Sequence, residues 1–362
     1  MKPIALIRFT ALAGLFAILL GSQTALAKPF MYVPLGDEGK IVVIDTAQDK
    51  VVDTIDGVGN AHGLAATPNG KFLIAGSIEA REAGSGAPEK PAEVTEEDHA
   101  AHHGAAPHDS PKAAAMISTV SVVRVSDGSV IRRIDVPGAV HHVAVSPNGR
   151  FAVVTHPKEG KISAIDLNSY EVVESVATGP APNYVVFSRD GDLVYVSNSG
   201  NNTVSAVNTG EWTVRWNFAV GASPEHVVLS GDGASLYVNN VEDGTVSVIE
   251  IGKQKVAQTI KIGARLHGID VSDDGKTLFV TDRDGNKLVA VDLESEARHE
   301  VPLEPAPYHL AVVRGMGKLY ISSAGAPKIW VVDRNSLAVS GEIPIGGRGH
   351  QMVLLTLDAQ GN

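Results

Sequence analysis

Apolar and polar side chains alternate in short runs between residues 224 and 263. The run TVSVIE at 245–250 alternates with a period of about two, and SLYVNN at 235–240 and KVAQTIK at 255–261 are further short runs of the same length class. A period of two is typical of a β-strand with one buried face. Glycine, asparagine and aspartate separate the runs, as tight turns require. Together with the apolar run at 226–230, this pattern predicts a unit of four short strands and no helix.

The same unit recurs with a period of 42 residues. A glycine closes the turn segments SPNG, SRDG, SGDG, SDDG and RGMG at Gly149, Gly191, Gly233, Gly275 and Gly317. We expect each of these glycines to adopt a positive φ in a hairpin turn. Four strands repeated at this period predict the blades of a β-propeller. Gly70 precedes Gly149 by 79 residues, so one interval holds 37 extra residues.

Chain length gives the number of blades. Residues 28–362 accommodate seven periods and the insertion with almost nothing left over, which predicts a single all-β domain of seven four-stranded blades. Residues 30–34, 40–45 and 50–55 match the second, third and fourth strands of a unit. The missing first strand is then 350–356, so we expect the N-terminal strands to close the ring by pairing with the C-terminal strand.

A family resemblance rests on the second strand of the unit. LVYVSN at 193–198, LYVNN at 236–240 and LFVTD at 278–282 resemble the signature of YVTN-type propeller repeats. That family occurs in bacterial periplasmic and surface propellers and is related in fold to cytochrome d1-type propellers. The resemblance implies the fold and leaves the function open, because propellers carry many unrelated functions.

The first 27 residues have the features of a signal peptide. A basic start is followed by an apolar run at 11–20 and by the small residues of Ala25-Leu26-Ala27. The apolar run is too short to span a bilayer as a helix. We therefore expect export to the periplasm and no membrane span after cleavage.

Composition excludes several kinds of site. The chain has no cysteine, so disulfides, thiolate metal sites, iron–sulfur clusters and covalently attached haem are excluded. Its formal net charge of −11 disfavours nucleic acid as a partner. Metal cations are compatible with that charge.

A column of polar residues lies eight positions before each repeat glycine. Its members are His62, His141, Asn183, Glu225, His267 and His309, and the C-terminal counterpart is His350 or Gln351. Two further histidines, His142 and His226, occupy the next position. The inner strand of each blade starts at the mouth of the central channel, so we expect these side chains to form a ring there. Their imidazoles could bind a metal or could simply satisfy loop carbonyls.

The insertion, at about 77–115, is rich in histidine and poor in large apolar residues, which predicts a flexible segment. It separates a second strand at 71–75 from a third strand at 117–123, and therefore leaves the blade on the face of the histidine column. Imidazole and carboxylate ligands suit Zn²⁺, Cu²⁺ or Ni²⁺. The alternative is a solvated acidic linker. The candidate ligands are His99, His102, His103 and His108, with Asp98 and Asp109.

Three functional hypotheses follow. The favoured one is a monomeric periplasmic protein that binds Zn²⁺ or Cu²⁺ and exchanges it with a metal-transport or cofactor-delivery protein. The second is a haem- or cofactor-handling propeller, or a lactonase- or lyase-like enzyme in which a histidine and Glu225 act as base and orienting group. The chain has no G-x-S-x-G motif and no phosphate loop, so we favour the binding protein over the enzyme. The third is a protein-interaction scaffold.

Overall fold

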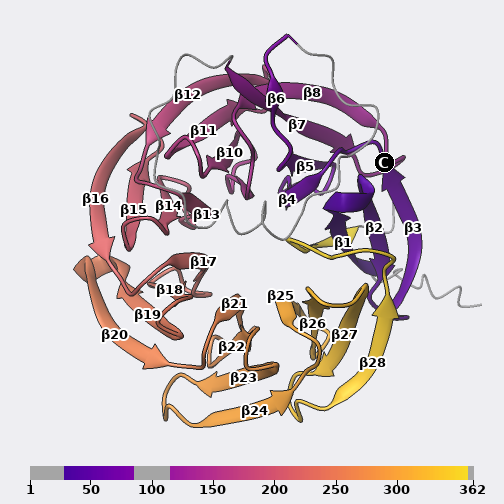
Figure 1. Cartoon of the computed structure of the whole chain (residues 1–362), viewed down its shortest axis with the longest axis vertical. Coiled ribbons are helices and arrows are strands. Elements are labelled where there is room, and N and C mark those ends of the chain that lie inside the picture. Colours follow the sequence, from indigo (N-terminus) through magenta and orange to yellow (C-terminus); the bar gives the residue numbers. More distant parts are fainter. Residues whose placement is uncertain (1–27, 85–114, 358–362) are drawn as a thin grey trace, which may run out of the picture.

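Seven antiparallel β-sheets form a ring around a central axis (Figure 1). The computed structural model describes residues 28–84 and 115–357. Six sheets have four strands, and the second has five because the short strand β6 adds to it. Within the described residues the only helices are two 3-10 turns, Gly36–Glu38 and Ile251–Lys253. The predicted all-β, seven-bladed propeller is therefore confirmed.

The blades follow one another along the chain. The first contains β29 (Val353–Leu357), β1 (Lys28–Leu35), β2 (Lys40–Asp45) and β3 (Lys50–Asp56). The second contains β4 (Ala61–Ala66), β5 (Phe72–Ser77), β6 (Arg81–Glu82), β7 (Met116–Arg124) and β8 (Val130–Pro137). The third contains β9 (Val143–Val145), β10 (Phe151–His156), β11 (Lys161–Asp166) and β12 (Glu171–Ala177).

The remaining four blades have the same order from the axis outward. The fourth contains β13 (Pro182–Phe187), β14 (Leu193–Asn198), β15 (Thr203–Asn208) and β16 (Thr213–Ala219). The fifth contains β17 (Pro224–Leu229), β18 (Ser235–Asn240), β19 (Thr245–Glu250) and β20 (Lys255–Lys261). The sixth contains β21 (Leu266–Val271), β22 (Thr277–Asp282), β23 (Lys287–Asp292) and β24 (Arg298–Pro302). The seventh contains β25 (Pro307–Val313), β26 (Lys318–Ser323), β27 (Lys328–Asp333) and β28 (Val339–Pro344).

The repeat glycine has the backbone conformation that its turn requires. At Gly70, Gly149, Gly191, Gly233, Gly275 and Gly317, φ lies between 66° and 79°. This left-handed region is open to glycine without a steric cost. The strands predicted at 235–240, 245–250 and 255–261 coincide with β18, β19 and β20. The sequence period therefore locates both the turns and the strands.

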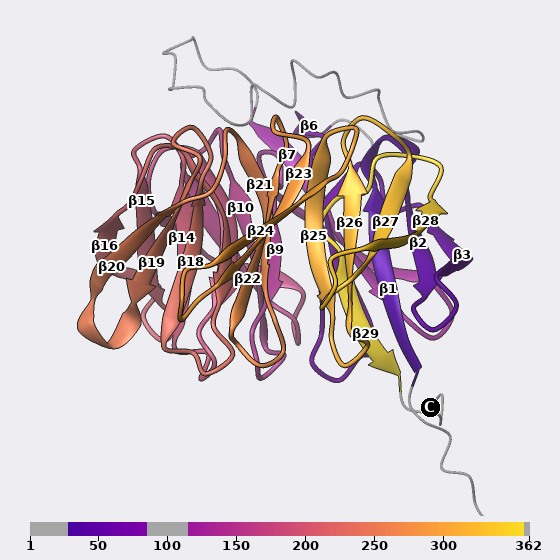
Figure 2. The same ribbon diagram turned by 90° about the horizontal axis from the view of Figure 1, so that it is seen from below.

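The ring closes as expected, through the C-terminal strand. β29 pairs antiparallel with β1, from Lys28 opposite Leu357 to Tyr32 opposite Val353 (Figure 2). Met31 and Val33 of β1 also pack with Tyr320 of the seventh blade in one buried cluster. Apolar contacts between neighbouring blades, together with this composite first blade, hold the ring shut.

Glycines on the innermost strands allow neighbouring blades to approach closely. A Cβ added to Gly268 would lie 2.6 Å from the Leu310 nitrogen and 2.6 Å from the Tyr308 oxygen. Gly268→Ala must therefore push β21 away from β25. We expect it to lower the free energy of unfolding by about 2–3 kcal/mol, the usual cost of overpacking.

Denaturant unfolding measures this effect. Gly341→Ala on the outer strand β28 is the matched control, because no atom lies within 4 Å of its added Cβ. Equal stability of the two variants would show that the inner strands can separate without cost.

None of the helices in residues 28–84 and 115–357 is long and apolar enough to cross a membrane.

Candidate functional site: a histidine cluster at the propeller axis

The predicted column of histidines meets at the propeller axis. Four of them lie on inner strands: His62 on β4, His226 on β17, His267 on β21 and His309 on β25. The others lie one to three residues before inner strands, namely His141 and His142 before β9, and His350 before β29. All seven side chains are buried, with exposed fractions of 0–5%. We call these seven residues the histidine cluster.

The imidazole rings are in contact across the axis. The ring centroid of His62 lies 4.2 Å from that of His350 and 4.4 Å from that of His141. On the opposite side, His226 lies 4.3 Å from His267. His142 and His226 bridge the two sides with centroids 5.1 Å apart. The column found in the sequence is therefore one continuous cluster in space.

Backbone carbonyls orient two of the rings. The Nδ1 atoms of His62 and His142 lie 3.0 Å from the carbonyl oxygens of His141 and Asn183, respectively. A carbonyl only accepts hydrogen bonds, so each Nδ1 carries the proton. In the neutral imidazole each Nε2 then presents its lone pair, which is the form of histidine that binds a metal.

A second ring of polar side chains fixes the backbone of the cluster from the neighbouring blade. Ser197 donates a hydrogen bond of 2.6 Å to the Glu225 carbonyl, and Asn239 donates one of 2.6 Å to the His267 carbonyl. Thr281 makes the same contact, 2.7 Å, with the Tyr308 carbonyl. Sequence reasoning missed this role. Its signal is the Ser, Thr or Asn that recurs near the end of the second strand in five blades, at Thr155, Ser197, Asn239, Thr281 and Ser322.

Glu225 brings a carboxylate into the cluster. Its side chain is 3% exposed, and its Oε2 atom lies 3.6 Å from His267 Nδ1. A buried carboxylate is costly unless a positive charge compensates it. The pair therefore favours a cation at this position, supplied either by a protonated imidazole or by a metal ion.

The donor atoms form four groups of three whose members lie within 4.8 Å of one another. Only one of these groups contains a carboxylate. The groups are His62–His309–His350, His62–His141–His142, His142–His226–His309 and Glu225–His226–His267. Every histidine predicted in the column thus belongs to at least one group that could hold a metal ion.

Two tyrosines that sequence reasoning missed complete the surroundings of the cluster. The Tyr308 ring stacks on His267 with centroids 3.8 Å apart, and the Tyr184 ring lies 4.5 Å from His142 and 4.8 Å from His226. Burial, reinforced by the charge of Asp270, raises the pKa of Tyr184 to about 12. Tyr184 therefore stays neutral at physiological pH and contributes no anionic ligand.

Gln351 does not share the role of His350. Its Oε1 atom accepts a hydrogen bond of 3.0 Å from the Leu64 backbone, and its Nε2 atom donates one of 3.1 Å to the Val143 carbonyl. The side chain thus bridges two inner strands. Of the two C-terminal candidates, only His350 joins a group of metal-ligand geometry.

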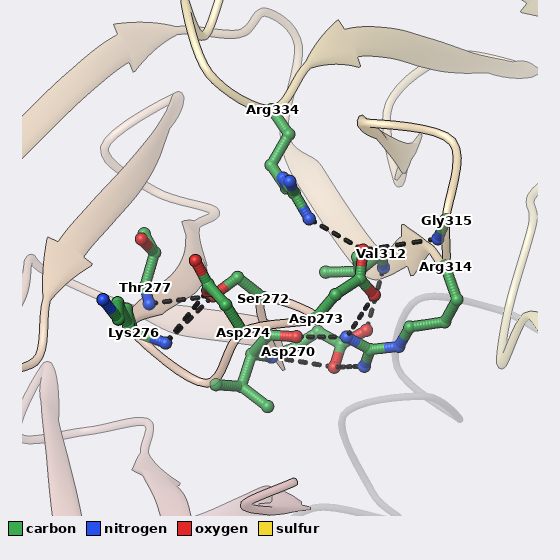
Figure 3. A network of polar contacts seen from close by, with 11 residues as sticks. Asp270, Ser272, Asp273, Asp274, Lys276, Thr277, Val312, Arg314, Gly315 and Arg334 are labelled. Carbon is green, nitrogen blue, oxygen red and sulfur yellow. Dashed lines mark hydrogen bonds and ion pairs between the residues drawn. The ribbon is translucent and has the colours of Figure 1, made fainter.

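A polar network joins the sixth and seventh blades three residues beyond His267 (Figure 3). Arg314 Nη2 lies 2.5 Å from Asp270 Oδ1, and Arg334 Nη1 lies 2.7 Å from Asp273 Oδ2. Burial raises the pKa of Asp270, although the Arg314 charge opposes this. Both ends of each contact lie within these two blades, so the network stabilises the interface between them.

His156 is a buried histidine outside the column. Its Nδ1 lies 3.1 Å from the Ala139 carbonyl and its Nε2 lies 2.9 Å from Ser163 Oγ. Burial lowers its pKa to about 4. Asn198 and Asn240 occupy the same place in their blades and donate to hydroxyls there. His156 is thus a structural residue at the end of β10.

This pKa predicts an acid-sensitive stability. Below the ordinary pKa of 6.5 the unfolded chain takes up a proton at His156, whereas the folded protein does not until about pH 4. The free energy of unfolding therefore falls as pH drops through this window, by about 3 kcal/mol from this residue alone. Between pH 7 and pH 4.5, we expect the free energy of unfolding of His156→Asn to fall by about 2–3 kcal/mol less than that of the parent protein. Urea unfolding at both pH values measures the difference. An equal fall in the free energy of unfolding of the two proteins would contradict the prediction.

The remaining predicted ligands, His99, His102, His103 and His108 with Asp98 and Asp109, lie outside the described residues. The described ends of the insertion form a short ladder, with Arg81 opposite Ile117 and Glu82 opposite Met116. Ala61 pairs with Ser77, so β5 ends beside the start of β4, where His62 lies. The insertion thus leaves the blade on the face of the cluster.

Sequence comparison relates part of the chain to a propeller family. The family model "Lactonase, 7-bladed beta-propeller" matches residues 151–295. A search of curated proteins finds no match. The family match supports the propeller fold, and the finer YVTN resemblance stays a prediction.

Solved structures share the fold over most of the chain. A putative 6-phosphogluconolactonase from Bacteroides uniformis superposes with a TM-score of 0.71 and 15% identity, covering 91% of this chain and 100% of that one. The Pseudomonas aeruginosa periplasmic gluconolactonase gives 0.68 and 17%, with 91% and 100% covered. The Kuenenia stuttgartiensis hydrazine synthase gives 0.63 and 17%, with 80% and 87% covered.

These comparisons bear on the functional hypotheses only in part. At such identities a structural likeness shows the fold alone. The case for a metal therefore depends on the site itself.

Proposed function

We propose that this protein binds one divalent transition-metal ion, Zn²⁺ or Cu²⁺, through Glu225, His226 and His267. The observation that carries the proposal is the buried Glu225 carboxylate beside two imidazoles in a cluster of seven histidines. Two histidines and one glutamate form a known zinc ligand set that leaves the fourth position open.

Charge favours this group over the other three. The ion would bring two positive charges into a buried site, and Glu225 alone among the four groups supplies a negative one. Two Zn²⁺ ions at about 6 Å would repel each other by about 10 kcal/mol at an effective dielectric constant of 20. A single ion with the carboxylate in its shell is therefore the preferred state.

The ligand atoms of the Glu225 group need to move only a short distance to bind a zinc ion. Ligand atoms of a tetrahedral zinc site lie about 3.3 Å apart, and those of this group lie within 4.8 Å of one another. Rotation of the side chains can close that gap without moving the strands, whose backbone Ser197 and Asn239 hold in place.

The cellular setting is part of the same proposal. The signal-like segment at 1–27 supports export to the periplasm, and the histidine-rich insertion supports capture of metal from solution. A periplasmic metal-transport or cofactor-delivery protein would then be the partner that receives the ion.

Metal titration tests the proposal. We expect the full mature chain, freed of metal, to bind one Zn²⁺ tightly and to unfold at a higher temperature when loaded. Cu²⁺ must be tested in parallel, because it binds nitrogen and oxygen ligands more strongly than Zn²⁺ in general. Excising residues 85–114 separates the contribution of the insertion. Ala83 already donates a 2.8 Å hydrogen bond to the Ala115 carbonyl, so Gly84 and one added asparagine can close a tight turn. Failure of the excised protein to bind any divalent ion would refute a site at the axis.

A lactonase is the second candidate, favoured by the family match over residues 151–295. Glu225 or a neighbouring imidazole would take a proton from water as its oxygen attacks the lactone carbonyl, and the ring oxygen would leave with a proton. Hydrolysis of gluconolactone above the uncatalysed rate, lost in Glu225→Gln, would support this function. A rate equal to the blank would exclude it for that substrate.

A further inference from the structure

We propose that the histidine cluster is a relay, in which one ion crosses the propeller axis by exchanging ligands between overlapping groups of three residues. This inference rests on the proposed function, because it concerns the route to and from the Glu225 group. It gives a role to the histidines of the cluster that do not bind the ion in the Glu225 group.

The overlap follows from the four groups. The group His142–His226–His309 shares His226 with the Glu225 group and His142 with the group His62–His141–His142. It shares His309 with the group His62–His309–His350. An ion can therefore pass from one group to the next while one imidazole stays bound.

Continuous ligation matters because the site is buried. An ion released from all its ligands there would lose both hydration and coordination, at a prohibitive cost. Zn²⁺ has a filled d shell and no geometric preference from it, so it tolerates a changing ligand set. Imidazole centroids spaced by 4.2–5.1 Å from His350 through His62, His142 and His226 to His267 keep the steps short.

The path has a direction. Its imidazole-only end, at His62 and His350, lies where the first and second blades meet, and its other end is at Glu225 on the fifth blade. The carboxylate stands only at that far end, so electrostatics draws the cation toward it. Glu225 would thus retain the ion, and His62 would hold it transiently in transit.

Two substitutions distinguish a relay from a cluster in which the ion leaves the Glu225 group directly. Removing His309 abolishes both groups that contain it, and the two groups that remain share no residue. Removing His350 abolishes one group and leaves an overlapping series from His62 to Glu225. Both variants lose one imidazole and keep the Glu225 group.

The experiment is removal of Zn²⁺ from the loaded, full-length protein by excess chelator in a stopped-flow instrument. We expect His309→Asn to slow removal at least about tenfold more than His350→Asn, the equivalent of about 1.4 kcal/mol in the barrier. His156→Asn controls for loss of a buried histidine outside the cluster. If His309→Asn does not fold, His309→Gln replaces it.

The outcomes are distinct. Equal rates in the two variants overturn the relay, because the ion then leaves the Glu225 group directly. A parent protein that binds no Zn²⁺ refutes the proposed function itself. Slower removal in His309→Asn, with an equilibrium affinity that still depends on Glu225, supports both.

Discussion

Glu225→Gln is expected to weaken Zn²⁺ binding at least about 100-fold, which corresponds to about 2.7 kcal/mol. Glutamine keeps the shape of the side chain and removes its charge. The ion then loses the only carboxylate in the four candidate groups, and the remaining ligands are neutral imidazoles. Isothermal titration with the excised or the full chain measures the change.

The same substitution should act in the opposite direction on the metal-free protein. Glu225 is 3% exposed, and ionising it there without a metal requires a compensating charge such as protonated His267. The neutral glutamine removes that requirement, so the metal-free variant should unfold at an equal or higher temperature than its parent. A general folding defect would lower stability instead.

Glu159→Gln is the matched control for this experiment. Glu159 is an exposed carboxylate outside the four groups, so the same loss of charge there leaves the cluster unchanged. Its replacement should leave Zn²⁺ affinity unchanged. If both glutamine variants bind Zn²⁺ like the parent, the carboxylate has no part in the site.

Truncation after Met352 is the second large effect, because it removes β29 from the axis. The loss of five residues that pair with β1 exposes the inner edge of the first blade. Three apolar side chains, those of Val353, Leu354 and Leu355, also leave the closed ring. We expect the free energy of unfolding to fall by about 3 kcal/mol or more, since Leu355 is buried and Val353 and Leu354 are half-buried.

Size-exclusion chromatography and urea unfolding follow this effect. The truncated chain should aggregate or unfold at a lower urea concentration, since an open inner edge can pair with another chain. Truncation after Leu357 is the control, because it keeps every pair between β1 and β29. Equal behaviour of the two truncations would show that the ring does not depend on its composite blade.

Much of the fold could be read directly from local pattern. A turn glycine with positive φ and an alternating strand depend on a few neighbouring residues, so β18, β19 and β20 were predictable to the residue. The composite first blade was predictable too, because the N-terminal run begins with a second strand. The short strand β6 was not, since two residues carry no period.

The residues of the candidate site were likewise predictable only in part. The column at eight residues before each glycine, its C-terminal counterpart and the position that follows it identified the seven histidines and Glu225, because each blade places these positions at a similar radius. It also included Asn183, whose backbone carbonyl orients His142, and offered Gln351, whose side chain bridges two inner strands. Tyr184 and Tyr308 escaped notice because an aromatic residue within a strand usually signals packing.

The sequence by itself determined the repeat, the strands of each blade, the means of closure and which residues point to the axis. Each of these is encoded by positions close in the chain or by one constant period. Only the tertiary structure decided which of those residues meet, that four groups overlap through shared histidines, and that Glu225 lies 3.6 Å from His267. Distances across the axis depend on the radius of the closed ring. That radius is set by the packing of all the blades together, and no single repeat contains it.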